Sequence, residues 1–154
     1  MVKFGAHENK ETVMKRSATA NWKGGLKAGK GTVSAASGTF SNVPYDFAQR
    51  FETGTGTSPE ELVASAHASC FAMALSAELE KVGLPPDNVD VRATVTLDRV
   101  ESGFAVTTSH LDATVHLPNP DKTKFERAAE AARAGCPISK LMSSAKITLD
   151  AKLA

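Results

Sequence analysis

The clearest helix signal of the chain lies between Ser58 and Lys81, and most of this segment is small or apolar on several faces. Ser58 can cap the helix, Pro59 suits its first position, and Glu61 completes a capping box. Gly83 ends it, and two prolines prevent its resumption. A helix that is apolar nearly all round must be buried on most sides. A single domain of this size would struggle to bury it, so we expect a second copy of the chain to help, in a homodimer.

The remaining segments predict a sheet that is mainly antiparallel. Apolar residues alternate from Val89 to Leu97 and again from Ala105 to Leu117, and Ser102-Gly103 between the two runs favours a hairpin. A second helix is expected from Lys122 to Ala134, closed by Gly135. This order of elements is typical of an α+β fold. Further strands are expected at Arg16 to Trp22, Thr32 to Ala35, Phe47 to Phe51 and Ala145 to Leu153, and one helical turn at Ile138 to Ser143.

The polar start of the chain predicts an N-terminal arm over residues 1–14, which we expect to be mobile, followed by a single domain over residues 15–154. A glycine-rich stretch from Lys23 to Gly31 lacks the spacing of a phosphate-binding Walker motif, and no helix pattern follows it. We therefore interpret it as a hairpin turn.

The composition narrows the classes of function. The chain has 154 residues and a formal net charge of +1, so no surface for nucleic acid or an anionic membrane is indicated. Its beginning lacks the apolar run of a secretory signal, and we expect no apolar stretch to reach the roughly 18 residues of a membrane span. Two cysteines are too few for a disulfide-stapled secreted scaffold. We expect a cytoplasmic protein, in which a cysteine pair is catalytic or redox-active more often than structural.

Cys70 lies in the middle of the apolar helix, and the other cysteine, Cys136, lies far along the chain between a glycine and a proline. At 100° per residue, His67 lies about 60° and Glu60 about 80° from Cys70 around the helix axis. Glu60 stands about 15 Å from the thiol along that axis, too far to touch the sulfur of its own helix. It could instead orient a cation, or act on the site of another copy in a dimer.

A cysteine must ionise before it can act as a nucleophile. Burial in an apolar helix raises the pKa of the Cys70 thiol, so activation needs a cation close by. The helix itself supplies only His67. Arg50 is the better candidate, because arginine is always charged and the Glu60 carboxylate can hold its guanidinium in a bidentate pair.

Other interpretations remain open at this point. A lone cysteine in an alanine-rich helix is usually core filler, and His67 is more often a hydrogen-bonding residue than a catalyst. A metal site of His67, Cys70 and Cys136 lacks the CxxC spacing and the ligand set that zinc favours. A cysteine-dependent acyl hydrolase using Cys70 with His67 would need an orienting group and an oxyanion hole, neither of which the sequence reveals. A redox sensor or a small-ligand binding protein is the non-enzymatic alternative.

Two motifs carry a family resemblance: SPEELVASAHASCFAMAL, from Ser58 to Leu75, and AGCPIS, from Ala134 to Ser139. Together they closely resemble the OsmC/Ohr family of thiol-dependent organic hydroperoxide reductases. The early segments Trp22 to Ser34 and Pro44 to Glu52 look like the osmotically inducible OsmC branch rather than the Ohr branch. The resemblance covers the chain from about Ser17 to Leu153.

The resemblance implies an OsmC-like fold, with antiparallel sheets wrapped around two long central helices in an intertwined homodimer and the active sites at the subunit interface. It implies that Cys70 is the peroxidatic cysteine and Cys136 the resolving one. It also implies that Arg50 and Glu60 interact and hold the thiolate reactive.

The function implied by the resemblance is that of a peroxidase in oxidative and osmotic stress defence. Organic hydroperoxides, and hydrogen peroxide less efficiently, would be reduced to alcohols or water through a Cys70 sulfenic acid and a Cys70–Cys136 disulfide. A dithiol, by family analogy a lipoylated protein, would restore the thiols, and no metal, haem or flavin cofactor is expected. Apolar surroundings that include Phe71, Met73 and Met142 would suit an alkyl or fatty-acid hydroperoxide.

Overall fold

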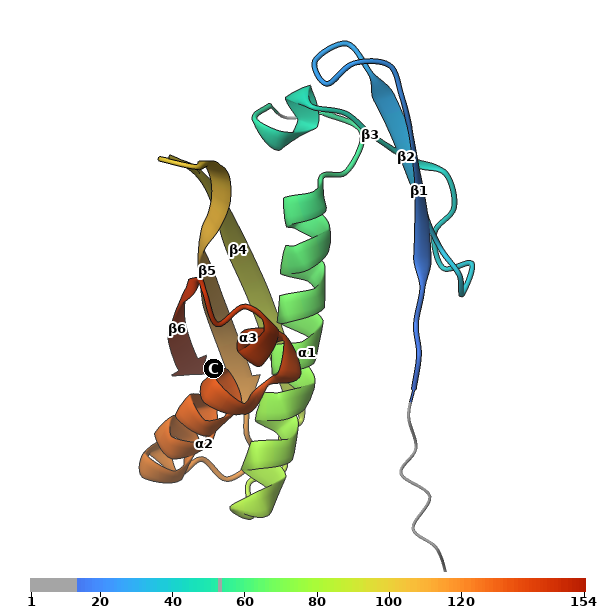
Figure 1. Ribbon diagram of the computed structural model, residues 1–154. Coiled ribbons are helices and arrows are strands. Elements are labelled where there is room, and N and C mark those ends of the chain that lie inside the picture. Colours follow the sequence, from blue (N-terminus) through green and yellow to red (C-terminus); the bar gives the residue numbers. More distant parts are fainter. Residues whose placement is uncertain (1–13, 53) are drawn as a thin grey trace, which may run out of the picture. The chain divides into compact units, whose positions relative to one another are not determined.

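The computed structural model describes residues 14–52 and 54–154. The chain divides into two compact units, Met1–Gly56 and Thr57–Ala154, which are described separately (Figure 1). The predicted arm over residues 1–14 lies outside the described residues except for Met14. The single domain predicted over residues 15–154 stays a prediction.

The first unit is a small antiparallel sheet with strand order β1-β2-β3, formed by β1 (Ala18–Lys23), β2 (Lys30–Ala35) and β3 (Val43–Tyr45). The glycine-rich stretch connects β1 to β2 as the predicted hairpin turn. Gly31 is required by close packing, because a Cβ atom there would lie 2.6 Å from the ring of Tyr45. The sheet therefore places an aromatic side chain directly over backbone.

The strand predicted from Phe47 to Phe51 is wrong, because this segment contains the 3-10 helix η1 (Ala48–Arg50). The carboxylate of Asp46 accepts the backbone N–H of Gln49 at 2.9 Å and so begins the helical turn. Phe47 and Phe51 then meet edge to face, with ring centroids 5.3 Å apart. Residues four apart meet in this way on a helical turn and not along a strand.

The second unit begins with the long helix α1 (Pro59–Lys81), as predicted from its caps. The Ser58 hydroxyl accepts the backbone N–H of Glu61 at 3.2 Å. The Glu61 carboxylate in turn accepts a hydrogen bond from the Thr57 hydroxyl at 2.8 Å. One stripe of the helix is buried and the opposite stripe is exposed; the buried residues are His67, Phe71, Leu75 and Leu79.

A three-stranded sheet with order β4-β5-β6 follows, covered on one face by helices (Figure 1). β4 (Asn88–Val100) and β5 (Gly103–His116) form the predicted antiparallel hairpin. β6 (Lys146–Leu153) pairs with β5 in parallel, which requires the crossover that α2 (Lys122–Gly135) and the short α3 (Pro137–Leu141) supply. The residues of β5 that face the helices are buried, as the alternation predicted: Ser109, Leu111, Ala113 and Val115.

Within this unit α1 is covered only in part. Met73, on the exposed stripe, is 74% accessible. By length and composition α1 is apolar enough to cross a membrane, so the expectation of no such stretch is wrong. That test is also passed by core helices. Because the long buried stripe of α1 packs on the sheet and α2, we interpret it as a core helix with one side left open.

Candidate active site

The two cysteines lie together in the second unit, as their use as a pair requires. Cys70 is half-buried on α1, whereas Cys136 is fully buried at the junction of α2 and α3. Both are free thiols, and the Cys136 side chain is in hydrogen-bonding contact with the Cys70 thiol. Residues 66 positions apart in the sequence thus meet in the fold.

Cys136 owes its place to two helix ends. Its backbone N–H donates to the carbonyl of Ala132 at 2.9 Å and closes α2, and its carbonyl accepts the N–H of Lys140 at 3.0 Å in α3. Pro137 at the first position of α3 suits a helix start, because its missing N–H would have no partner there. Glycine and proline on either side of Cys136 therefore build a sharp corner that presents the thiol to α1.

The surroundings of Cys70 act on its pKa in opposite directions. Burial raises the pKa of the thiol, as predicted, and contact with Cys136 raises it further. The backbone N–H of Ile138 donates a hydrogen bond to Cys70 and lowers the pKa, but burial is the larger effect. The surroundings within this unit thus leave Cys70 harder to ionise than a free cysteine, and the activating charge must be added to them.

His67 lies one helical turn before Cys70 and is fully buried. Its Nδ1 lies 2.7 Å from the Ser109 hydroxyl on β5, and its Nε2 lies 2.9 Å from the Ser139 hydroxyl on α3. Burial lowers the pKa of His67, which favours the neutral ring. Both ring nitrogens already have serine partners, so this arrangement does not offer His67 as the base for Cys70 or as a metal ligand.

Sequence reasoning missed Ser109 and Ser139. Each hydroxyl is buried and is satisfied by the imidazole. The one available signal was their position: Ser109 falls on the inward parity of β5, and Ser139 follows Cys136 by one turn. A buried hydroxyl needs a hydrogen-bond partner, but position alone does not say which residue supplies it.

A mostly apolar pocket of about 300 Å³ is lined in part by α3. Ile138, whose N–H contacts Cys70, lines it, whereas neither thiol does. Met142 lines this pocket, as expected for a substrate-lining residue. Phe71 and Met73 do not: Phe71 is fully buried in the core, and Met73 points outward on the exposed stripe of α1. The pocket is lined by Val63, Ala66, Val106, Ile138, Leu141, Met142, Ser144 and Ala145.

The other two predicted residues belong to different units. Arg50 is half-buried at the end of η1 in the first unit, and Glu60 is half-buried in the first turn of α1 in the second. The predicted Arg50–Glu60 pair and its action on Cys70 stay predictions.

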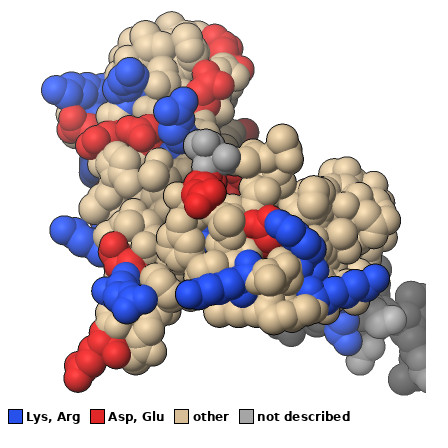
Figure 2. Space-filling view, turned by 90° about the horizontal axis from the view of Figure 1, so that it is seen from above, with Lys and Arg blue, Asp and Glu red and all other residues tan. Residues whose placement is uncertain are grey.

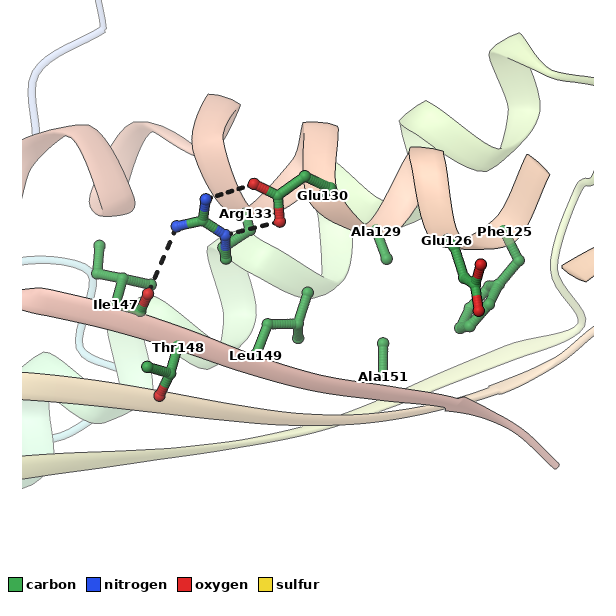
Figure 3. A pocket seen from close by; sticks show the side chains of 9 residues that line it. All are labelled: Phe125, Glu126, Ala129, Glu130, Arg133, Ile147, Thr148, Leu149 and Ala151. Atoms are coloured by element: carbon green, nitrogen blue, oxygen red, sulfur yellow. Dashed lines mark hydrogen bonds and ion pairs between the residues drawn. The ribbon is translucent and has the colours of Figure 1, made fainter. Parts of the chain in front are cut away.

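A larger pocket of about 400 Å³ between α2 and β6 is separate from the thiols (Figure 3). Arg133 lies along it, held by the carboxylate of Glu130 and reaching the carbonyl of Ile147 at 3.4 Å. This pairing raises the pKa of Arg133 and lowers that of Glu130. Because each charge already has its counter-charge, the pocket offers a ligand little unpaired polarity.

Among the described residues, the only group of histidine, cysteine and acidic side chains close enough to share a metal ion is His110, Asp112 and Asp150. It lies on the outward face of β5 and β6, where Asp150 is 81% exposed. His67, Cys70 and Cys136 do not form such a group. On the face that Figure 2 presents, basic and acidic side chains are interspersed with uncharged surface.

Comparison with known proteins identifies named relatives of this chain. The chain is 47% identical over 134 residues to Peroxiredoxin OsmC of Escherichia coli, an alignment that covers 87% of this chain and 93% of the relative. It is 31% identical over 88 residues to the organic hydroperoxide resistance protein of Xanthomonas axonopodis pv. citri, covering 56% and 59%.

Solved structures share the fold. The organic hydroperoxide resistance protein OhrB of Bacillus subtilis matches with a TM-score of 0.65 and 24% identity, over 88% of this chain and 98% of that one. The OsmC-like protein of Mycoplasma pneumoniae matches with a TM-score of 0.71 and 18% identity, over 93% and 99%. Both confirm the predicted α+β fold. The sequence profile of the family described as OsmC-like protein matches residues 52–152, and the chain belongs to this family.

Proposed function

We propose that the chain is a thiol-dependent peroxidase that reduces organic hydroperoxides, and hydrogen peroxide less efficiently, in stress defence. One observation carries the proposal: a half-buried Cys70 lies against a fully buried second thiol, Cys136. Ile138, which contacts Cys70, also lines a mostly apolar pocket. The names of the relatives, a peroxiredoxin and organic hydroperoxide resistance proteins, support the same activity.

In the first step the Cys70 thiolate attacks the distal oxygen of the hydroperoxide. An S–O bond forms, the O–O bond breaks, and the leaving alkoxide takes a proton and departs as an alcohol. Cys70 is left as a sulfenic acid. A half-buried sulfur suits this step, because peroxide must reach it while bulk solvent stays largely outside.

In the second step the Cys136 sulfur attacks the sulfur of the Cys70 sulfenic acid. The S–S bond forms, the S–O bond breaks, and water leaves with the thiol proton. The contact between the two side chains favours this step, since the second thiol already lies against Cys70. A dithiol, in our proposal a lipoylated protein, then reduces the disulfide by two thiol–disulfide exchanges.

Activation of Cys70 is assigned to Arg50, positioned by Glu60. The reason is electrostatic: burial holds the pKa of Cys70 up, and the N–H of Ile138 offsets burial only in part. A guanidinium close to the sulfur would favour the thiolate, and a carboxylate partner would fix its orientation. Which copy of the chain supplies Arg50 and Glu60 to each site depends on the homodimer that we also propose.

The proposed homodimer follows from the open side of α1. A stripe of small and apolar residues, with Met73 on it, stays exposed in the single chain, and a second α1 would cover it. The peroxidase is proposed to be cytoplasmic, where dithiol reductants keep thiols reduced.

The apolar pocket supports an alkyl hydroperoxide as the preferred substrate class. Its accessible surface is mostly apolar. Ile138 lines it from α3, and Met142 lines it from the residue that directly follows α3. A hydrocarbon group would displace water from such a surface favourably, which hydrogen peroxide cannot do.

The acyl hydrolase alternative would need His67 as its general base, and His67 is not available for that role. Nδ1 and Nε2 of His67 are engaged by Ser109 and Ser139, and its ring is fully buried. A sensor that switches once per oxidation event keeps the same two thiols and is separated from a peroxidase by turnover alone.

The test is steady-state consumption of cumene hydroperoxide with dihydrolipoamide as reductant. Wild-type protein should turn over many times, and Cys70→Ser should not. Cys136→Ser should react once and accumulate a sulfenic acid that dimedone traps. Sustained turnover by Cys70→Ser would contradict the proposal, and a single oxidation of the wild type without turnover would favour the sensor.

A further inference from the structure

His67 has no part in the proposed chemistry, although it is fully buried and makes two short side-chain hydrogen bonds. A buried imidazole loses its hydration, and partners for both nitrogens are needed to offset that loss. Ser109 and Ser139 are those partners, and they come from a different strand and a different helix. The imidazole therefore joins three elements at one point: α1, β5 and α3.

The position of this junction relative to the thiols is the significant feature. His67 and Cys70 lie three residues apart on α1, and their partners on α3, Ser139 and Ile138, are adjacent. One hydrogen bond, between His67 Nε2 and the Ser139 hydroxyl at 2.9 Å, thus connects α1 to α3. Beside it, the Ile138 N–H contacts the Cys70 sulfur closely enough to lower the pKa of the thiol. Cys136 begins the same short helix.

We propose that His67, through Ser139, is a positioning residue that holds α3 so that the Ile138 N–H and the Cys136 thiol both reach the sulfur of Cys70. The bond to Ser109 fixes the ring from the other side, so that α3 is anchored to the sheet as well as to α1. The role of Cys136 as the resolving thiol rests on the proposed function. The positioning of the Ile138 N–H does not.

The His67–Ser139 hydrogen bond, which tethers α3 to α1, acts on two properties of Cys70. Releasing α3 weakens the Ile138 hydrogen bond, the contact that lowers the pKa of Cys70, so the pKa rises. It also separates Cys136 from Cys70, which slows attack on the sulfenic acid. The chemistry of the first attack should be unchanged once Cys70 is ionised, because His67 and Ser139 are buried and bonded to one another and have no assigned role in the attack.

The test compares Ser139→Ala and His67→Asn with wild type. Asparagine places its amide near the Nδ1 position and keeps a partner for Ser109, but it is too short to reach Ser139. Ser139→Thr keeps the hydroxyl and is the conservative variant. Ser102→Ala is the matched control, since this exposed serine lies in the turn between β4 and β5 and on neither α1 nor α3.

Two readouts are taken on reduced, full-length protein that matches the wild-type circular dichroism at the assay temperature. The first is the rate of Cys70 alkylation by iodoacetamide as a function of pH, resolved from Cys136 by peptide mass spectrometry. The second is a single turnover with one equivalent of cumene hydroperoxide, quenched for sulfenic acid and disulfide. Alkylation needs no peroxide, so it tests the tether even if the proposed peroxidase activity fails.

We expect Ser139→Ala and His67→Asn to shift the alkylation midpoint to higher pH with an unchanged plateau. Disulfide formation should slow about tenfold, the size expected for one lost buried hydrogen bond. Ser139→Thr should recover most of both properties, and Ser102→Ala should match wild type. A folded Ser139→Ala protein with wild-type midpoint and disulfide rate would overturn the proposal, as would Ser139→Thr behaving like Ser139→Ala. Failure of peroxide to oxidise wild-type Cys70 would instead contradict the proposed function.

Discussion

The backbone N–H of Ile138 contacts the thiol of Cys70 and lowers its pKa, and the neighbouring Cys136 opposes this by raising the pKa of the same thiol. The same corner of the chain, at the start of α3, thus supplies both contacts. An amide N–H stabilises the thiolate, whereas a second sulfur that can itself become anionic destabilises it.

Replacing Cys136 by alanine should therefore lower the pKa of Cys70, even though it removes the proposed resolving thiol. The first oxidation should then reach its maximal rate at lower pH, while multiple turnover is lost. Titration of thiolate absorbance in the single-cysteine protein measures the pKa directly. A pKa of Cys70 that stays level or rises in Cys136→Ala would show that the two thiols are not coupled in this way.

Arg50 is predicted to supply the activating charge. Arg50→Ala should raise the pKa of Cys70 and slow its oxidation at neutral pH, because the cation that favours the thiolate is lost. Arg50→Lys is the matched variant: it keeps the charge but loses the bidentate fork, and it should recover only part of the effect. The rate of Cys70 alkylation as a function of pH tests this prediction. An unchanged pH dependence in Arg50→Ala would show that Arg50 does not activate Cys70.

The helices and strands that local signals define could be predicted from the sequence. α1 was bounded by its cap and its following glycine and prolines, and the β4–β5 hairpin by two alternating runs. The strand expected at Phe47 to Phe51 failed because two phenylalanines four residues apart suit a helical turn once Asp46 begins it. Local propensity alone does not show whether this segment forms a strand or a helical turn.

The pairing of the cysteines came from family resemblance, and no local pattern predicts it. The partners of His67 show the same limit. They lie 42 and 72 residues away, and a serine on an inward-facing position reveals only that it needs a partner. Long-range hydrogen bonds are products of the packed fold, so they could be read only after the fold was known.

The exposed stripe of α1 predicts that a charge placed on it would dissociate the proposed dimer. Met73 is 74% exposed in the single chain, and Met73→Glu would bury a carboxylate if a second α1 packs there. The variant should dissociate into folded monomers, detected by analytical ultracentrifugation with circular dichroism as the check on folding. Met14→Glu, on a residue 65% exposed in the first unit, is the control. A Met73→Glu protein that stays dimeric places the interface elsewhere.

The apolar pocket predicts a change in substrate preference. Val63 lines it from α1, away from the thiols in sequence, and Val63→Phe would fill part of its volume of about 300 Å³. KM for cumene hydroperoxide should rise several-fold, since less of the ring can be buried, while the rate with hydrogen peroxide should stay near wild type. Equal losses for both peroxides would indicate damage to the thiols and not to a substrate pocket. Val89→Leu, on the sheet beneath the core, controls for altered packing.

His67 makes the stability of the protein depend on pH in a known direction. Burial lowers its pKa from the ordinary value of 6.5, so below that pH the unfolded chain binds a proton that the folded chain refuses. The free energy of unfolding should fall as the pH drops through 6.5, until the pH reaches the lowered pKa of the folded state, by at most about 1.4 kcal/mol per pH unit for one proton. Urea unfolding across this range measures the slope. His67→Gln should be less stable at neutral pH but show a flatter slope, whereas His116→Gln, at an exposed histidine of β5, should keep the wild-type slope. If the free energy of unfolding of His67→Gln had the wild-type slope against pH, His67 would not be the group that causes the pH dependence.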